Sequence, residues 1–529
     1  MEVEVKQGKL VGIKEKSVLN GYEYYSFLGI PYAQPPIDDL RFRPPVPIDK
    51  WNGVYEAKKE PAPCYQYDIM NNNELVGSED CLYLNVFTPA APSDIKVPKA
   101  VMVFIHGGGF LFGSSSPMTY SADYLMNYDV VLVTVNYRLH ALGFLNMGIE
   151  DCPGNCGLKD QMTAFQWIKE NIRQFGGDPG NVTIFGESAG ASSVHWHMLS
   201  PLSKGLFEKA ILQSGVTSCA WSFSSNPIEN GFRLGRYLGF EEKDPKMLIE
   251  FLKKQPVKNI LDATTKMYKD TLNELFGIAA AIPFAPSVET IKENAFITDV
   301  PENLCKNIPP VPTIAGINDK EGRLIFLSLM EKIVQIQADL TPVIKNNFQF
   351  KDSQLREVVN EVKKYYFANG GSISATFSAL TDLYTDIYFR KFHPTIDYIA
   401  NSNAPLYVYQ FSFNGDLNPT KRLMLQPFKY LFAEGASHAD ELAYLFYPKS
   451  LPDPKFGKCE TKVIENMCTL WTNFAKTGNP NGETISIEWK PYTSEKSCYL
   501  QIKDDLKLIQ GSLLEKGSTF WKKIEEKYK

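Results

Sequence analysis

The sequence predicts an α/β fold in which a large, mostly parallel sheet carries helices on both faces. Residues 100–105 and 129–136 are continuous apolar, β-branched runs, which suit strands buried on both faces. Apolar residues then recur at steps of three or four over 158–175, which indicates one helix with an apolar stripe. Short apolar strands at 181–185 and 209–214 follow. This alternation of strand and helix implies parallel pairing.

The rest of the chain extends this pattern in both directions. The first twelve residues alternate apolar and polar side chains and end in glycine, as a strand and a turn do. After residue 225 the pattern becomes rich in helices. Later strands are predicted at 312–316, 405–413 and 498–502, and later helices at 248–255, 356–367 and 520–529. Nothing between them has the composition of a flexible linker, so we expect one domain over residues 1–529 with helical insertions.

The composition excludes several classes of protein. The chain has 529 residues, 44% of them apolar and 22% charged, which excludes a disordered chain and a small disulfide scaffold. Its net charge is −5 and it has no dense basic run, so we expect no nucleic-acid partner. No stretch approaches about 18 consecutive apolar residues, so we expect no membrane-spanning helix.

The start of the chain and its cysteines bear on location. No basic region followed by an apolar secretion signal opens the chain, so we expect a cytoplasmic location. A chain trimmed of its signal would look the same, which leaves secretion open. The nine cysteines are odd in number and spread out, which argues against a disulfide framework. Cys152 and Cys156 lack nearby histidines, so we interpret them as small loop residues and expect no metal.

A G-x-S-x-G motif formed by Gly186, Ser188 and Gly190 is the most informative segment. It follows an apolar strand and precedes small residues that can open a helix. A nucleophile held on such a sharp turn needs a strained backbone, and larger neighbours would collide with the strand and the helix. A chance match is the alternative, but the strand–turn–helix context favours a nucleophilic serine.

A glycine-rich loop from His106 to Phe110 follows the strand that ends at Ile105. Consecutive glycines expose backbone N–H groups with no side chains in the way. Together with the N–H of Ala189, they can form an oxyanion hole. A merely flexible loop is the alternative. A phosphate cradle is disfavoured, because the loop has no lysine and no P-loop motif.

A nucleophilic serine needs a histidine base, because the proton acceptor must titrate near neutrality. In such sites the order along the chain is serine, acid, histidine, which removes the two histidines before Ser188. His195 and His197 follow the elbow too closely to fold back over it, so we interpret them as packing residues. His438 lies in a loop of small residues, and His393 looks like a helix end. Spacing favours His438 and leaves His393 open.

Spacing does not fix the acid. The loop after the strand at 312–316 offers Asp319 and Glu321. Both would lie at the C-terminal end of a strand, where sites of α/β proteins are built.

The chain resembles the carboxylesterase/cholinesterase (type-B) family of α/β-hydrolases. Eight ordered segments carry the resemblance: residues 26–45, 77–87, 106–110, 136–145, 153–168, 175–190, 317–322 and 435–446. Within the family it most resembles insect α-type carboxylesterases without a secretion signal. The resemblance implies an α/β-hydrolase fold and hydrolysis of carboxylic esters without a metal or an organic cofactor.

Carried over by position, the resemblance assigns a catalytic triad and an oxyanion hole: Ser188 as nucleophile, Glu321 as acid, His438 as base, and the N–H groups of Gly108, Gly109 and Ala189. Trp221 matches a position that lines the acyl pocket, with an ordinary core aromatic as the alternative.

The resemblance also implies structural contacts. Arg41 should pair with Glu79 and Arg138 with Asp160, and we interpret both as structural ion pairs. Secreted relatives close a disulfide at the positions of Cys64 and Cys81. This bond could form here in an oxidising medium, whereas a cytosolic pair would stay reduced.

Two departures from family patterns disfavour particular substrate classes. Choline-ester hydrolases carry a tryptophan between the two cysteines, and none lies between Cys64 and Cys81, so a cation–π platform is missing. Juvenile-hormone esterases typically have glutamine where Glu187 precedes the serine, which disfavours that activity. We therefore expect small to medium hydrophobic esters as substrates and organophosphates as inhibitors.

The biological role follows from the resemblance alone. We expect insect detoxification or clearance of xenobiotic or odorant esters. A slow-turnover sequestering esterase and a juvenile-hormone-type esterase are the alternatives. A non-catalytic binding module is disfavoured, because the chain keeps all three triad positions.

Overall fold

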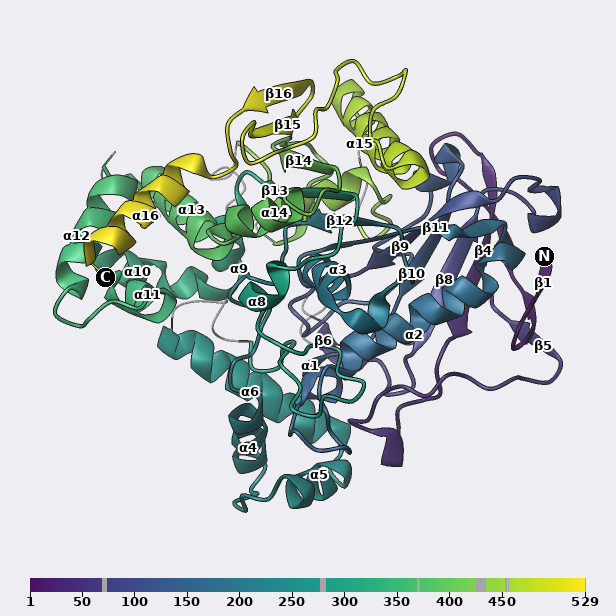
Figure 1. Cartoon of the computed structure of the whole chain (residues 1–529), viewed down its shortest axis with the longest axis horizontal. Helices are drawn as coiled ribbons and strands as arrows, with labels where there is room; N and C mark the ends of the chain where they lie inside the picture. Colours follow the sequence, from purple (N-terminus) through teal and green to yellow (C-terminus); the bar gives the residue numbers. More distant parts are fainter. Residues whose placement is uncertain are drawn as a thin grey trace.

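The computed structural model describes residues 1–68, 74–275, 282–368, 372–424, 434–451, 454 and 456–528. A single large sheet of eleven strands crosses the molecule (Figure 1). Its strands are, in spatial order, β16 (Leu506–Gln510), β15 (Cys498–Ile502), β14 (Leu406–Phe411), β13 (Thr313–Asn318), β12 (Lys209–Gln213), β11 (Gly177–Glu187), β9 (Lys99–Ile105), β10 (Val131–Val135), β8 (Tyr83–Thr88), β4 (Glu23–Pro31) and β3 (Ile13–Lys16). The predicted α/β class is confirmed.

The centre of the sheet is parallel, as the alternation of strands and helices predicts. All neighbours from β10 across β9, β11, β12, β13 and β14 to β15 pair in parallel. Strands β8, β4 and β3 at one edge and β16 at the other pair antiparallel. The sequence did not predict β4, because Gly29 and Pro31 interrupt its apolar run.

Strand β9 shows why the central strands read as unbroken apolar runs. Its residues Val101, Val103 and Ile105 join one core cluster, while Ala100, Met102 and Phe104 join the other. Helices α2 (Cys156–Asn171) and α3 (Ala189–Leu199) cover the first face, and α15 (Lys458–Thr477) covers the second. A strand covered on both sides must be apolar at every position.

Apart from α1, the remaining helices follow β12, and most of them lie toward the left and the bottom of the view, away from the N-terminal strands (Figure 1). Those that the sequence predicted are α5 (Pro245–Lys253), α12 (Leu355–Tyr366) and α16 (Glu515–Tyr528). The others are α1 (His140–Phe144), α4 (Pro227–Tyr237), α6 (Val257–Leu275), α8 (Pro301–Cys305), α9 (Leu324–Leu329), α10 (Ile333–Ala338), α11 (Thr341–Asn347), α13 (Ile373–Phe389) and α14 (Phe392–Ala400). Within the described ranges, no helix has the length and apolar character needed to cross a membrane.

Short N-terminal strands complete the fold. Strands β1 (Glu2–Val5), β2 (Gly8–Val11) and β5 (Val54–Glu56) form a separate three-stranded sheet. Strands β6 (Gln66–Asp68) and β7 (Glu74–Val76) pair antiparallel. Where one strand ending in a turn was predicted over the first twelve residues, the structure has two strands joined by a turn at residues 6–7.

The structural contacts implied by the resemblance are present. Cys64 and Cys81 are joined by a disulfide. The Arg41 guanidinium donates to Glu79 at 2.7 Å and also to backbone carbonyls at the C-terminal end of α5. Arg138 and Asp160 are 2.6 Å apart and almost fully buried. Both ion pairs connect segments far apart in sequence, which fits a structural role.

Candidate active site

Ser188 lies on the turn between β11 and α3, at the carboxyl edge of the parallel strands. Its backbone has φ 56° and ψ −119°, a conformation that L residues rarely adopt. The turn is held because the Ser188 N–H donates to the carbonyl of Gln213 at the end of β12, at 2.8 Å. The sequence thus places its serine on a strained strand-to-helix turn, as predicted.

The glycines of the motif are required by close backbone contacts. A Cβ on Gly190 would lie 2.0 Å from the Ile105 carbonyl oxygen, and a Cβ on Gly186 would lie 2.5 Å from the Gly190 carbonyl carbon. Real Cβ atoms do not approach backbone this closely. The predicted collision of larger side chains with strand and helix is therefore borne out by the coordinates.

Three backbone amides near Ser188 have no acceptor. Within the part of the chain that the structure describes, the N–H groups of Gly108, Gly109 and Ala189 donate no hydrogen bond. Gly108 and Gly109 have φ of 106° and 61°, which favours glycine. Orphaned N–H groups are rare in folded proteins. These three are free to bind an oxygen atom of a ligand.

Glu321 is fully buried and sits in the loop after β13. One carboxylate oxygen accepts from the Ser214 hydroxyl at 2.5 Å and from the Asn318 N–H at 2.7 Å. The other lies 2.5 Å from Nδ1 of His438. Asp319, the other candidate acid, instead accepts from the N–H of Ala436 at 2.7 Å. The structure thus brings Glu321, and not Asp319, to the histidine.

His438 lies between two glutamates. Its Nε2 is 3.0 Å from Oε1 of Glu187, the residue before the serine, although not in hydrogen-bond geometry. Burial alone would lower the pKa of His438, but the charges of Glu187 and Glu321 outweigh it and raise that pKa well above its ordinary value. Among the described residues, no hydrogen bond joins Ser188 Oγ to the imidazole. Such bonds are often long in unliganded sites and tighten when substrate binds.

Glu441 is a third buried carboxylate, which sequence reasoning missed. It accepts from Gln213 Nε2 at 3.1 Å and from Asn318 Nδ2 at 2.6 Å. Burial, with the nearby charge of Glu187, raises the pKa of Glu441 to about 8. Its place three residues after His438 is the only sequence signal that could have pointed to it.

The other candidate histidines lie elsewhere. His393 is 3.3 Å from Asp397 on its own helix, α14. On α3, His197 contacts Ser203 and Gln161, and His195 accepts from the N–H of Thr217. The packing interpretation of the α3 histidines agrees with these contacts.

Trp221 lies in the loop after β12, is 8% exposed and belongs to the core cluster that also contains Ala189 and Val194 of α3. Cys152 and Cys156 donate to separate backbone carbonyls, of Leu145 and Phe42. No cluster of three or more potential metal ligands occurs among the described residues.

A half-buried serine at the carboxyl edge of a parallel sheet, with free amides beside it, is the arrangement used for acyl transfer on α/β-hydrolase folds. The class of protein is therefore a serine hydrolase.

Comparison with known proteins narrows this class. The Carboxylesterase family matches residues 1–521. Esterase FE4 of Myzus persicae is 35% identical, over 93% of this chain and 86% of the relative. Bile salt-activated lipase of Bos taurus is 33% identical over 94% and 83%. Juvenile hormone esterase of Tribolium castaneum is 31% identical over 95% and 87%. The chain belongs to the carboxylesterase family and is a serine carboxylic ester hydrolase.

Proposed function

We propose that Ser188, His438 and Glu321 form the catalytic triad and that hydrolysis proceeds through an acyl-enzyme. The observation that carries the proposal is the 2.5 Å contact of Glu321 with His438 Nδ1, which leaves Nε2 facing the elbow that holds Ser188. The free amides of Gly108, Gly109 and Ala189 are the proposed oxyanion hole.

In the first half of the reaction, neutral His438 takes the Ser188 hydroxyl proton on Nε2 as Oγ attacks the ester carbonyl. The free amides donate to the resulting oxyanion, where each donor is worth about 10²–10³-fold in rate. Glu321 orients the imidazole and stabilises its protonated form. When the tetrahedral intermediate collapses, Nε2 gives the proton to the leaving alkoxide and an alcohol departs.

In the second half, water takes the place of the alcohol. His438 removes a proton from water as its oxygen attacks the acyl carbon, and a second oxyanion forms in the same hole. Collapse breaks the bond to Ser188 Oγ, which regains its proton from Nε2, and the carboxylic acid leaves.

We propose small to medium hydrophobic esters as substrates. Two buried carboxylates, Glu187 and Glu321, flank His438. Their charge disfavours anionic acyl groups. We base a role in detoxification or in clearing xenobiotic or odorant esters on the family resemblance. Organophosphates should inhibit by phosphorylating Ser188 Oγ with loss of their leaving group.

We retain a cytoplasmic location as a proposal with its own test. The reducing cytosol would open the bond between Cys64 and Cys81. Thiol alkylation of protein from its native cells, followed by mass spectrometry, should find this pair reduced, and an oxidised pair would favour secretion.

The proposed function is tested with the Ser188→Ala variant. Turnover of p-nitrophenyl esters should fall at least about 10⁴-fold, because the nucleophile is lost, while the melting temperature stays unchanged. Ser192→Ala is the matched control, since the Ser192 hydroxyl is buried one turn later and has no partner among the described residues. Retained turnover in Ser188→Ala would end the proposal. An initial burst followed by slow release would identify a sequestering esterase.

The acid is tested separately. Glu321→Gln should damage turnover far more than Asp319→Asn, because only Glu321 contacts His438. The opposite ranking would move the assignment to Asp319.

A further inference from the structure

A buried ion pair outside the active site joins Lys159 on α2 to Glu289, with Nζ 2.6 Å from the carboxylate. The side chains are only 6% and 1% exposed. Removing two charges from water costs free energy that their attraction only partly returns, so stability alone is a weak reason for such a pair. Its neighbours indicate what else it does.

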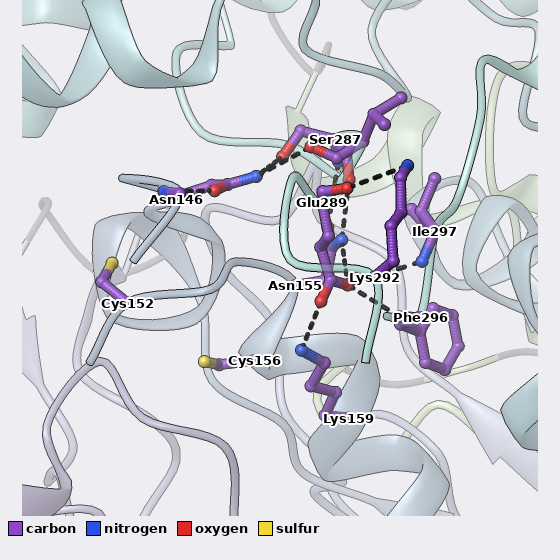
Figure 2. Close-up of polar contacts among 12 residues, drawn as sticks. Asn146, Cys152, Asn155, Cys156, Lys159, Ser287, Glu289, Lys292, Phe296 and Ile297 are labelled. Carbon is purple, nitrogen blue, oxygen red and sulfur yellow. Dashed lines mark hydrogen bonds and ion pairs between the residues drawn. The ribbon is translucent and has the colours of Figure 1, made fainter. Parts of the chain in front are cut away.

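Glu289 is the centre of a hydrogen-bonded cluster (Figure 2). One carboxylate oxygen accepts from Asn155 Nδ2 at 2.8 Å and from the N–H of Phe296 at 2.9 Å. The other accepts from Lys159. The N–H of Ile297 also donates to the first oxygen, at 3.4 Å. The carboxylate therefore has a charged partner and three further donors, which fixes its place relative to α2.

Asn155 binds the same segment from the side. Its Oδ1 accepts from the N–H of Ser287 at 2.9 Å, and its Nδ2 donates to the Ser287 carbonyl at 2.7 Å. Asn146 adds bonds from its Nδ2 to Ser287 Oγ at 2.9 Å and to the Val288 carbonyl at 3.1 Å. Asn155 lies between Cys152 and Cys156 in the sequence. This asparagine binds Ser287 and Glu289, whereas neither cysteine sulfur takes part in the cluster (Figure 2).

The other end of this segment reaches the glycine loop. Ile282 is partly buried, and its Cδ1 lies 3.3 Å from where a Cβ on Gly109 would stand. Between the two ends, the Pro283 carbonyl accepts from Asn230 and the Pro286 carbonyl accepts from the N–H of Ser224, both at 2.8 Å. Residues 282–289 therefore form a strip that runs from the glycine loop to α2; we call it the 282–289 strip.

We propose that Glu289 is a positioning residue that fixes the 282–289 strip beside Gly109 and so sets which acyl groups the enzyme accepts. The inference rests on the proposed function. The acyl group stays at the oxyanion amides through both halves of the reaction, whereas the alcohol leaves after the first. A wall that contacts Gly109 therefore meets the acyl group in both halves.

The test measures acyl-chain preference in the full-length enzyme. Glu289→Gln keeps the shape of the side chain but leaves Lys159 buried without its counter-charge, so the strip should shift. The readout is the ratio of kcat/KM for p-nitrophenyl hexanoate to that for p-nitrophenyl acetate. This ratio does not depend on the fraction of folded enzyme. It should change at least about tenfold, since one methylene in an apolar pocket is worth about 10–200-fold.

Glu208→Gln is the matched control. Glu208 also holds a lysine of α2, Lys169 at 3.1 Å, and a backbone amide, that of Val182 at 2.7 Å. Glu208 directly precedes β12, whose other end carries the Gln213 carbonyl that binds the Ser188 N–H. The hexanoate-to-acetate ratio of Glu208→Gln should therefore stay that of the wild type. An unchanged ratio in Glu289→Gln, with or without a lower melting temperature, would show a purely structural pair and overturn the inference.

A milder variant keeps the inference testable if Glu289→Gln does not fold. Ser287→Ala removes only the Oγ acceptor of Asn146, which keeps its bond to Val288. It should shift the ratio less than tenfold, and a ratio within error of the wild type would overturn the inference. Ser188→Ala is assayed in the same experiment to separate the two proposals. Retained turnover in Ser188→Ala would contradict the catalytic triad, whereas an unchanged acyl ratio in Glu289→Gln or Ser287→Ala would contradict the role of Glu289.

Discussion

The elbow around Ser188 and the loop around His438 are held in place by different kinds of contact. At the elbow, backbone packs directly on backbone: the Cα of Gly190 lies against the Ile105 carbonyl, and Gly215 leaves no room for a Cβ beside the Ser188 carbonyl. No polar side chain is needed there, because close backbone packing and the bond from the Ser188 N–H to the Gln213 carbonyl fix the turn.

The histidine loop is held by polar side chains, two from the end of β13 and one from the loop itself. Asn318 Nδ2 donates to the Ser437 carbonyl at 2.7 Å, and Asp319 accepts from the N–H of Ala436 at 2.7 Å. Asp440 accepts from the N–H groups of Ser437 at 2.7 Å and Thr420 at 3.1 Å. The nucleophile is thus positioned by backbone packing that any added Cβ would disrupt. The base is positioned by several side-chain hydrogen bonds, each of which a single substitution can remove.

Gly190→Ala should have the greatest effect. A Cβ 2.0 Å from the Ile105 carbonyl oxygen forces strand and helix apart, which should cost about 3 kcal/mol and reduce kcat by about 10²-fold or more. Urea unfolding and ester assays measure both. Gly180→Ala on β11, the strand that leads into the elbow, is the control, because the nearest atom to its Cβ is 3.4 Å away. If Gly190→Ala kept wild-type stability and kcat, close backbone packing at the elbow would not be what positions Ser188.

Asn318→Ala should have an intermediate effect. It leaves the Ser437 carbonyl and the Glu441 carboxylate without their shared donor, at a cost of about 1–3 kcal/mol. We expect kcat to fall about tenfold to a hundredfold with little change in KM. Asn473→Ala, which removes comparable bonds to the carbonyls of Pro480 and Asn481, should leave kcat unchanged. Equal losses in both variants would argue against a specific hold on the histidine loop.

Glu187→Gln should change the pH dependence. The negative charge of Glu187 raises the pKa of His438, and only the neutral imidazole can accept the serine proton. In the wild type, activity should therefore appear only above the ordinary range for histidine. Removing the charge lowers this pKa, so the acid limb of kcat/KM against pH should move to lower pH.

Glu441→Gln is the comparison for this shift. Glu441 is as deeply buried as Glu187, but it bonds to Gln213 and Asn318 and does not contact His438. In Glu441→Gln, the acid limb of kcat/KM against pH should move less than in Glu187→Gln. A larger movement in Glu441→Gln than in Glu187→Gln would contradict the contact between Glu187 and Nε2.

Trp221→Leu should have the smallest effect. If the loop after β12 lines the acyl side, a smaller side chain should raise the ratio of hexanoate to acetate turnover by up to about tenfold. Trp167→Leu is the control, since Trp167 is equally buried but packs on Phe175 at the far end of α2. An unchanged ratio would make Trp221 an ordinary core aromatic.

The same contrast explains what the sequence could predict. The parallel strands and the elbow follow from short-range patterns, since apolar runs mark β9 and β10 and two glycines mark the turn. Spacing favoured His438 over His393 and left the latter open, and the choice of Glu321 over Asp319 came only from family resemblance. Those choices depend on contacts such as that of Asn318 with Ser437, which no local pattern encodes.

Two further features lay outside any sequence pattern. The approach of Glu187 to His438 joins residues on different sides of the site, and burial of both is needed before their charges interact strongly. The pair of Lys159 with Glu289 looks in sequence like two surface charges. Only the fold shows that both are buried.

The triad residues are far apart in sequence, so they emerge from the ribosome at different times. Glu321 and His438 are 117 residues apart, which corresponds to about 6–23 s of synthesis at about 5–20 residues per second. During that interval the acid loop has no imidazole to neutralise it, and burying a lone carboxylate is unfavourable. The nascent protein should therefore carry its serine for several seconds as an inert hydroxyl, and hydrolytic power should arrive in one late step, when the last third of the polypeptide docks.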